Sequence, residues 1–448
     1  MASVGVVGAG AAGLAAAYRL MRLGHDVAVY EAAHRVGGAV RTERRDGFLA
    51  EHGPNSMQAP SGAVAQLFRD CGLDQRRIDA DPAARKRYVV RGGELRPLPL
   101  SPSALLTSSL LSARAKLALA AEPFAPRAPA GDESIAAFVR RRLGREFLDY
   151  MADPFVTGIY AGDPEALSMR HALPRIYALE QTYGSVLRAA FKRARKGERP
   201  PTLISFGDGL EELPNHLTRA LGDRVRLARR VDVVRRDEQM WAVETSSSSG
   251  RHDAVVLAAP AHALARLRLE GRHGERIAEL TAIPHPAVAT LILGFRRADV
   301  AHPLDGFGML IPAAERRRIL GVIFSSTVFP GRAPDDHVTL SVFMGGARQP
   351  DVAGLDAGQL QEVALAELGK LLGVHGSPVF LAEARWPQAI PQYVLGYDRF
   401  LAALDTIEAA NPGLRFAGSY RDGVALGDAL GSGLDAADAL HARLRRHS

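Results

Sequence analysis

The pattern of apolar and polar residues at the start of the chain predicts a strand, a tight turn, a helix and a second strand. Residues 4–7 are a short apolar run, and the glycine-rich residues 8–13 follow it. Apolar side chains then recur at helical spacing up to Gly24, and residues 27–30 form a β-branched run that ends at Glu31. This order of elements is the repeating unit of a parallel α/β sheet.

Later changes in the pattern divide the chain into alternating segments. Helical spacing prevails at residues 102–124 and 188–199, and a strand, a glycine turn and a helix occupy residues 413–437. Strand-like runs begin at residue 202 and recur at residues 289–295, 308–311, 320–324 and 338–343. We therefore expect an α/β fold with α+β insertions. A Rossmann-like domain (residues 1–82, 200–283 and 392–448) would be interrupted by a helical domain (residues 83–199) and a strand-rich sheet domain (residues 284–391).

The turn at residues 8–13 carries the spacing G-x-G-x-x-G. Gly8 allows a sharp turn, Gly10 leaves space for a pyrophosphate, and Gly13 lets helix and strand pack closely, while the helix N-terminus supplies N–H donors. Glu31 ends the second strand, where a carboxylate can bind ribose hydroxyls and would repel a 2′-phosphate. This context favours dinucleotide binding over a purely structural turn. We predict contacts from Gly8, Ala9, Gly10, Ala11, Ala12, Gly13, Glu31 and Ala32.

Two further glycine motifs follow the first one. Arg35 precedes the pair Gly37-Gly38, and a second turn begins at Gly53. Backbone clearance and a cation suit an extended dinucleotide. This arrangement resembles the flavoprotein family that contains amine oxidases, phytoene desaturases and protoporphyrinogen oxidases, which implies FAD rather than NAD. On this basis the next cofactor contacts are expected from Arg35, Gly38, Ala39, Gly53, Pro54, Asn55 and Ser56.

Composition narrows the range of functions only slightly. The chain has 448 residues, of which 47% are hydrophobic, so it can build two or three joined domains. Its formal net charge of +7 comes mainly from dispersed arginines, without a zinc pattern or an aromatic RNA-binding motif, so we expect no metal and no nucleic-acid partner. The one cysteine, Cys71, excludes an internal disulfide and favours a reducing compartment.

The middle of the chain has two interpretations. Residues 102–124 are rich in leucine, and residues 188–199 carry basic side chains at roughly helical spacing. Such segments can lie on an anionic membrane surface, but they equally suit a core helix and a solvated linker. No apolar run is long enough to cross a bilayer, and the first strand begins too near residue 1 for us to expect a targeting segment.

Four further segments narrow the resemblance to the protoporphyrinogen oxidase family. They are KRY at residues 86–88, DPFVTGIYAGDP at 153–164, FPGRAP at 329–334 and RWPQAIPQY at 385–393. The similarity extends from the first strand to about Ala439. It implies FAD-dependent oxidation of protoporphyrinogen IX to protoporphyrin IX in haem biosynthesis, with molecular oxygen reduced to hydrogen peroxide.

The resemblance also implies where the substrate and the rest of the cofactor bind. The helical domain would face the membrane and admit the substrate, the sheet domain would bind it, and the two chain ends would enclose the flavin. Arg87 would pair with a propionate, Gly158 would face the macrocycle, and Leu310, Ile323 and Phe343 would sandwich its rings. The remaining FAD contacts would come from Val231, Trp386, Gly418, Val424, Ala425 and Leu426.

The sequence leaves several points open. Asp422 replaces the family's usual small residue, which puts the geometry of the last turn in question. We predict no catalytic acid or base, and we interpret His52 as structural. The alternatives are a coproporphyrinogen III oxidase of the same fold, another FAD-dependent amine oxidase or carotenoid desaturase, and a non-catalytic flavin- or tetrapyrrole-binding partner. We expect a cytoplasmic protein, peripheral on the inner face of the cell membrane, with a homodimer among the open oligomeric states.

Overall fold

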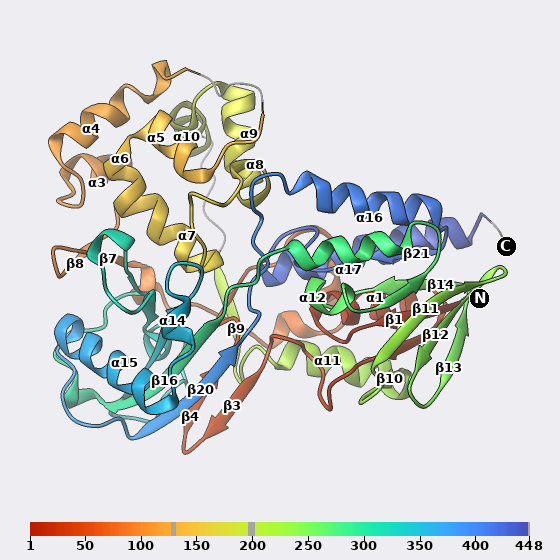
Figure 1. The fold of residues 1–448 in the computed structure, drawn as a ribbon. Helices are drawn as coiled ribbons and strands as arrows, with labels where there is room; N and C mark the ends of the chain where they lie inside the picture. The colour runs from red at the N-terminus through yellow and green to blue at the C-terminus, as the bar shows by residue number, and fades with distance from the viewer. Residues whose placement is uncertain (100, 127–130, 196–201, 447–448) are drawn as a thin grey trace.

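The computed structural model describes residues 1–99, 101–126, 131–195 and 202–446. Figure 1 shows a group of helices at the upper left, a large sheet below it and a second α/β unit on the right, where both chain termini lie. The three units share contacts throughout, so no flexible linker separates them in the described part of the chain.

A five-stranded parallel sheet forms the centre of the unit on the right. Its order is β10 (Val225–Arg226), β2 (Asp26–Tyr30), β1 (Ser3–Val7), β14 (Ala254–Leu257) and β21 (Leu414–Phe416). The strands from the two ends of the chain, β1 and β21, both pair with β14. The predicted Rossmann-like fold is therefore confirmed, and it is assembled from segments that lie far apart in the sequence.

Two helices from opposite ends of the chain close this sheet. Helix α1 (Ala11–Arg22) packs against β1, and α17 (Leu426–Leu444) packs against both α1 and β14. A Cβ atom added to Gly433 would lie 2.0 Å from the carbonyl oxygen of Ala12, so the helices approach more closely than any larger residue allows. The ring of His25 bonds that of His441 at 2.9 Å across the same contact. The expected meeting of the two chain ends is thus present.

Smaller elements complete this unit. A four-stranded sheet contains β13 (Ser249–His252), β12 (Met240–Thr245), β11 (Val231–Asp237) and β15 (Arg268–Glu270). A hairpin joins β3 (Thr42–Arg45) to β4 (Phe48–Glu51), and a three-stranded sheet contains β5 (Met57–Gln58), β9 (Leu203–Phe206) and β6 (Arg77–Asp79). The helices are α2 (Gly62–Asp70), α11 (Glu212–Leu221), α12 (Ala261–Leu264) and α16 (Asp398–Ala410).

A seven-stranded sheet forms the second unit. Its order is β20 (Phe380–Trp386), β16 (Val288–Arg296), β19 (His337–Gly345), β18 (Gly321–Ile323), β17 (Gly308–Leu310), β7 (Arg87–Arg91) and β8 (Glu94–Pro97). One face packs on α15 (Ala357–Leu372), and the short helices α13 (Ser325–Val328) and α14 (Pro350–Ala353) join the strands. The predicted strands between residues 289 and 343 are all present.

This sheet corrects one predicted boundary. Residues 83–199 were expected to form a helical domain, but β7 and β8 belong to the seven-stranded sheet, with β7 parallel to β17. The hydrophobic pattern could not reveal this, because the pairing partner of β7 lies more than two hundred residues further along the chain. The consequence is that Arg87 stands on the sheet itself.

The helical unit contains α3 (Pro102–Thr107), α4 (Ala113–Ala120), α5 (Ile135–Leu143), α6 (Arg145–Phe147), α7 (Asp153–Tyr160), α8 (Met169–Ala172), α9 (Pro174–Tyr183) and α10 (Val186–Arg195). The leucine-rich run breaks before α4, where Ser112 caps the helix. Leu110 and Leu111 are buried, whereas Leu117 is 72% exposed and Phe124 is 83% exposed. This segment therefore combines buried and exposed apolar side chains, and its contact with a membrane stays a prediction. Residues 196–199 of the basic run lie outside the described residues.

Within the described ranges, no helix has the length and apolar character that crossing a bilayer requires. The helical unit has an apolar core that includes Ile135, Phe138 and Leu148, and buried ion pairs add to it. The guanidinium of Arg142 lies 2.6 Å from a carboxylate oxygen of Glu122 and 2.7 Å from one of Glu180, and none of these three side chains is exposed. The unit therefore keeps a fixed shape beside the large sheet.

Candidate functional site

The first glycine turn has the geometry of an anion site. Gly8 has φ 103°, in the left-handed region, and its N–H donates to the carbonyl of Tyr30 at 2.8 Å. A Cβ on Gly13 would lie 1.9 Å from the carbonyl oxygen of Gly8, so helix α1 can start this close to the turn only with glycine. A Cβ on Gly10, in contrast, would meet nothing within 4 Å, and no side chain caps α1. Open space thus faces free N–H donors at a helix N-terminus, as a pyrophosphate needs.

Glu31 connects the turn to the end of β2. One carboxylate oxygen accepts the N–H of Ala9 at 2.7 Å, and the other accepts the N–H of Ala33 at 2.8 Å. Each oxygen keeps a second lone pair, so a ribose hydroxyl can still bind here. The carbonyl of Glu31 accepts the N–H of Arg229 at 2.7 Å, and this brings the segment leading to Val231 alongside. The predicted cofactor contacts of Glu31, Ala32 and Val231 stay predictions, in a geometry that suits them.

Arg35 has a role that its sequence motif did not reveal. Its guanidinium donates to the carbonyls of Val36 and Gly38 at 2.9 and 2.5 Å and of Val40 at 3.1 Å. These bonds hold the loop that brings Gly38 against Gly10, where a Cβ on Gly38 would lie 3.3 Å from the Gly10 Cα atom. Arg35 therefore shapes the glycine loop, and a direct contact with phosphate is an additional prediction.

The second glycine turn, at Gly53, lies against the loop that follows Gly38. A Cβ on Gly53 would lie 1.9 Å from the carbonyl oxygen of Ala39, so the two predicted cofactor segments touch through their backbones. The indole N–H of Trp386, at the end of β20, donates to the carbonyl of His52 at 2.9 Å. The structure thus joins Trp386 to the segment that contains Gly53, although more than three hundred residues separate them in sequence.

The last predicted segment forms the closing turn. The N–H of Gly418 donates to the Ser432 hydroxyl at 2.9 Å, and that hydroxyl donates to the carboxylate of Asp422. Asp422, the departure from the family pattern, therefore accepts a hydrogen bond from helix α17 and fits the turn. Ala425 precedes α17 without a side-chain cap, so the first N–H groups of this helix are also available to a ligand. Gly418, Val424 and Leu426 flank this opening.

The residues predicted to bind substrate share one face of the seven-stranded sheet. The strand register places Arg87 and Ile323 in one row across β7, β17 and β18. Leu310 and Phe343 form the next row across β17, β18 and β19. Residues two apart on a strand point to the same face, so the two rows are neighbours. Each row has a glycine, Gly308 or Gly321, between its two larger residues. No side chain therefore projects from the sheet at these positions.

Helix α7 stands over this face. A Cβ on Gly158 would lie 3.0 Å from a methyl group of Leu310, so the helix approaches the sheet at this point. Phe155 and Ile159 flank Gly158 and stay 43% and 36% exposed. Helix α7 therefore meets the sheet at Leu310 and also exposes apolar side chains.

Arg87 supplies the positive charge on this face. Its guanidinium carbon lies 5.1 Å from the centre of the Phe307 ring, and the side chain is exposed. Its neighbour Lys86 forms an ion pair with Asp305. Among the described residues no carboxylate or carbonyl accepts a hydrogen bond from Arg87, so its donors are free for a carboxylate.

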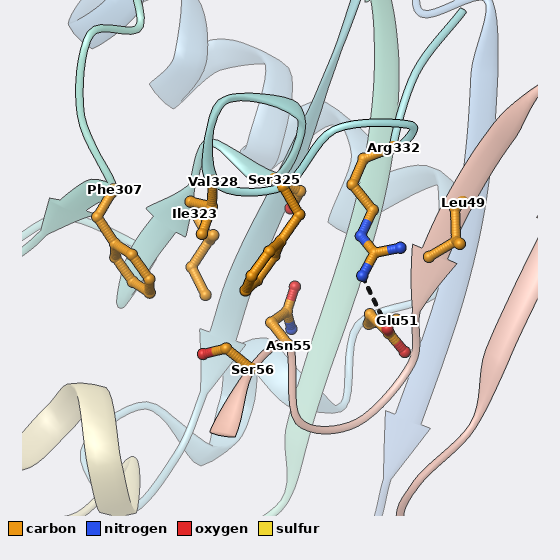
Figure 2. A pocket seen from close by; sticks show the side chains of 10 residues that line it. Leu49, Glu51, Asn55, Ser56, Phe307, Ile323, Ser325, Val328 and Arg332 are labelled. Atoms are coloured by element: carbon orange, nitrogen blue, oxygen red, sulfur yellow. Dashed lines mark ion pairs between the residues drawn. The ribbon is translucent and has the colours of Figure 1, made fainter. Parts of the chain in front are cut away.

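A pocket links this face to the cofactor segments (Figure 2). Asn55 and Ser56 lie at its floor, Phe307 and Ile323 line one end, and Arg332 reaches down from above in Figure 2. One predicted substrate residue and two predicted cofactor residues thus border the same pocket.

The polar end of the pocket contains a pair that the sequence did not single out. Glu51 and Arg332 are 4% and 2% exposed, and their charged groups lie 3.7 Å apart. Burial raises the pKa of Glu51 to about 7, although hydrogen bonds from Thr42 and the Leu210 N–H at 2.6 and 2.8 Å partly oppose this rise. The motif at residues 329–334 contained Arg332, but its contact with Glu51 depends on the packing of β4 under the sheet unit.

Comparison with known proteins agrees with this geometry. Residues 11–441 match the family of flavin containing amine oxidoreductases. The chain is 34% identical to protoporphyrinogen oxidase 2 of Arabidopsis thaliana over 97% of this chain and 93% of that protein. It is 31% identical to human protoporphyrinogen oxidase, with 97% of both chains covered, and 26% identical to the coproporphyrinogen III oxidase of Bacillus subtilis, over 96% of this chain and 95% of that protein.

Solved structures show the same fold. An Exiguobacterium protein provisionally assigned as a protoporphyrinogen oxidase superposes with a TM-score of 0.84 at 25% identity, covering 98% of this chain and 99% of that chain. A putrescine oxidase superposes with a TM-score of 0.70 at 19% identity, covering 99% of both chains. The second similarity concerns the fold alone.

The raised pKa of Glu51 gives a test of this end of the pocket. The folded protein holds this proton up to about pH 7, whereas an unfolded chain releases it near pH 4.5, so the contribution of Glu51 to stability falls as pH rises between these values. We expect the free energy of unfolding of Glu51→Gln, relative to wild type, to increase from about pH 5 to pH 8. Urea unfolding across this range measures it, with Glu94→Gln, whose side chain is 69% exposed, as the control. A constant difference between wild type and Glu51→Gln would contradict the assignment.

Proposed function

The chain belongs to the family of flavin containing amine oxidoreductases, and we propose that it is an FAD-dependent oxidase that converts protoporphyrinogen IX to protoporphyrin IX with molecular oxygen. The observation that carries this proposal is the sheet face that combines two apolar rows with the guanidinium of Arg87, which has no acidic partner among the described residues. A tetrapyrrole with propionates presents the matching surfaces, an apolar macrocycle with carboxylates at its edge. The relatives named above support the same substrate class.

The residues of the site fit FAD. The open space before Gly10, the uncapped N-termini of α1 and α17 and the carboxylate of Glu31 provide places for a pyrophosphate and a ribose. FAD held there would supply the redox chemistry, three two-electron oxidations of the substrate coupled to reduction of three molecules of oxygen to hydrogen peroxide. The protein has to bind the two molecules, orient them and exclude water.

The chain's own residues carry out these tasks. Arg87 binds a propionate and the rows that contain Ile323 and Leu310 hold the macrocycle, while Gly158 lets α7 approach the methyl group of Leu310. Glu51 lines the pocket but is only 4% exposed and lies beside the guanidinium of Arg332, so we assign it a structural role. We assign no catalytic acid or base, in keeping with the prediction from sequence.

We also propose that the helical unit rests on a membrane surface. The exposed side chains of Leu117 and Phe124 belong to consecutive elements at the edge of this unit. Helix α4 contains two cations and no acidic residue, and the basic helix α10 belongs to the same unit. Exposed apolar side chains beside cations suit an anionic lipid surface, and the inner face of the cell membrane is such a surface.

The activity itself is the first test. The purified protein should carry bound FAD, and protoporphyrinogen IX added under air should give porphyrin fluorescence together with hydrogen peroxide. Under anaerobic conditions the same substrate should bleach the flavin absorbance once and then stop. Equal or faster turnover of coproporphyrinogen III would assign the protein to the alternative that the Bacillus subtilis relative represents. An unbleached flavin would reject an oxidase of either porphyrinogen.

Removal of the charge at Arg87 tests substrate binding. Arg87→Met keeps an unbranched apolar side chain but removes the guanidinium, and with it the contact with the Phe307 ring and the donors for a propionate. A charge-assisted hydrogen bond contributes about 1.5 to 3 kcal/mol, so we expect KM to rise about 10- to 100-fold while kcat changes little. Steady-state kinetics with Arg85→Met, a change at a neighbouring exposed arginine, provide the comparison. An unchanged KM in Arg87→Met would remove this residue from the site.

Membrane binding can be measured by flotation with anionic liposomes. The double variant Leu117→Glu/Phe124→Glu should lose binding, because it places two carboxylates where apolar side chains would enter the lipid. Higher salt should weaken binding of the wild type, since part of the attraction is electrostatic. Val379→Glu, a change at a 49% exposed position of the sheet unit, should bind like the wild type. Absence of wild-type binding at low salt would reject the proposal.

A further inference from the structure

The segment that follows β20 connects the helical unit to the closing turn. The carbonyl of Tyr393 accepts the N–H of Ser168 at 2.8 Å, and Val394 pairs with Leu167 as in an antiparallel strand. The side-chain amide of Gln392 donates to the carbonyl of Tyr160 at 2.9 Å, at the end of helix α7. One edge of this segment is therefore bonded to the helical unit through backbone groups.

The other side of the segment reaches the closing turn through Tyr393. Its hydroxyl donates to the carbonyl of Ser419 at 2.7 Å and accepts the N–H of Gly423 at 2.9 Å. A single hydroxyl thus spans the two ends of the turn that precedes α17. Gly423 has φ 129°, in the region that favours glycine, and its N–H bonds the Tyr393 hydroxyl.

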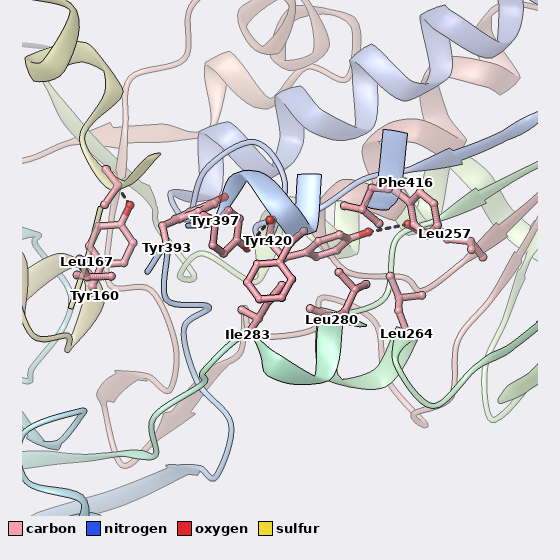
Figure 3. Close-up of a cluster of buried hydrophobic side chains, with 14 of the residues drawn as sticks. Tyr160, Leu167, Leu257, Leu264, Leu280, Ile283, Tyr393, Tyr397, Phe416 and Tyr420 are labelled. Atoms are coloured by element: carbon pink, nitrogen blue, oxygen red, sulfur yellow. Dashed lines mark hydrogen bonds between the residues drawn. The ribbon is translucent and has the colours of Figure 1, made fainter. Parts of the chain in front are cut away.

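Tyr397 adds a second bond to the same turn. Its hydroxyl donates to the carbonyl of Tyr420 at 2.6 Å, and its ring lies 4.4 Å from that of Tyr393. Figure 3 shows Tyr160, Tyr393, Tyr397 and Tyr420 in one row between the helical unit and the parallel sheet. Burial raises the pKa of both Tyr393 and Tyr397 well above the ordinary value, so both hydroxyls keep their protons and remain donors.

We propose that Tyr393 and Tyr397 are positioning residues for FAD, which fix the turn at residues 418–424 and the N-terminus of α17 in the geometry that receives the cofactor. This inference rests on the proposed function, because it assumes that this turn faces the flavin. Other side-chain bonds of the turn run to Ser432 of α17, from Tyr420 to the carbonyl of Leu257 at 3.3 Å, and from Arg421 to Asp405 at 2.8 Å. These partners all belong to the parallel-sheet unit. Tyr393 differs from them because its segment also bonds the helical unit.

The inference has a consequence for the loading of FAD. Because Tyr393 also bonds Ser168 through its carbonyl, the helical unit and the closing turn share one residue. A cofactor that orders the turn should therefore also order the segment from Gln392 to Tyr397 and its contacts with the helical unit. FAD binding should accordingly protect the amides of Ser168 and Gly423 from hydrogen exchange.

The row of tyrosines contains its own control. The hydroxyl of Tyr160 donates to the carbonyl of Ala172 at 2.9 Å, within the helical unit, and its ring lies 6.3 Å from that of Tyr393. Tyr160→Phe and Tyr393→Phe each remove one buried hydroxyl from the same row. Only Tyr393→Phe removes bonds to the turn and leaves the N–H of Gly423 without its partner.

The experiment is a titration of the FAD-free protein with FAD, followed by quenching of flavin fluorescence. Loss of two hydrogen bonds and exposure of an unpaired donor should weaken FAD binding about tenfold in Tyr393→Phe, and several-fold in Tyr397→Phe. Tyr160→Phe should bind FAD within about twofold of the wild type. The absorption envelope of bound flavin should change in Tyr393→Phe and not in Tyr160→Phe, because only the former alters contacts beside the cofactor. Wild-type affinity and spectrum in Tyr393→Phe, or equal weakening in Tyr160→Phe, would overturn the inference.

Two features keep this titration independent of the folding of any one variant and of the proposed substrate. Urea unfolding of the FAD-free variants shows whether each one folds, and if Tyr393→Phe does not fold, Tyr397→Phe decides the question by the same titration. No porphyrinogen is present, so an error in the proposed substrate leaves the result unchanged. A wild-type protein that binds no FAD at all would instead refute the proposed function.

Discussion

The close approach of the first and last helices is the contact on which the rest of the structure depends. The N-terminus of α1 faces a ligand only because Gly13 lets the helix start against the carbonyl of Gly8, and α17 reaches α1 only because Gly433 lies against the carbonyl of Ala12. A methyl group at either glycine would overlap a backbone oxygen, at 1.9 and 2.0 Å respectively. The N-termini of α1 and α17 have no side-chain caps, and both helices pack on one parallel sheet. In this sheet β14 pairs with both β1 and β21.

The substrate face has a different physical basis, which is strand register. Arg87, Leu310, Ile323 and Phe343 share a face because β7, β17, β18 and β19 pair without a one-residue shift. A shift of one residue in β7 would turn Arg87 into the apolar interior beneath α15 and bring Tyr88 to the surface. The opposite face is closed by buried Met309 and Val322, which fixes the register through the burial of apolar area.

The site lies where the three units meet, and polar contacts hold each junction. Asp153 at the start of α7 forms an ion pair with Arg348 of the sheet unit and accepts the N–H of Ala313 at 2.8 Å. Glu51 and Arg332 join the parallel-sheet unit to the sheet unit, and Tyr393 joins the closing turn to the helical unit. Removal of a partner from a buried charged contact leaves the other charge unpaired, so these junctions favour one arrangement of the units over others. The pocket and the substrate face depend on that arrangement.

The sequence by itself determined the features that follow from local steric rules. The spacing of Gly8, Gly10 and Gly13 with Glu31 predicted the turn, the helix and the acid at the strand end, because backbone clearance depends only on neighbouring residues. The family resemblance added Arg87 and the apolar positions of the substrate face, whose contacts with substrate stay predictions. Only the tertiary structure decided that Arg87 lies on a strand of the large sheet, that Arg35 holds its own loop, and that Glu51 meets Arg332. It alone showed that a hydroxyl of Tyr393 spans the closing turn. Each of these contacts joins groups whose packing is set by the register of strands or by the docking of whole units, and hydrophobic periodicity contains no information about either.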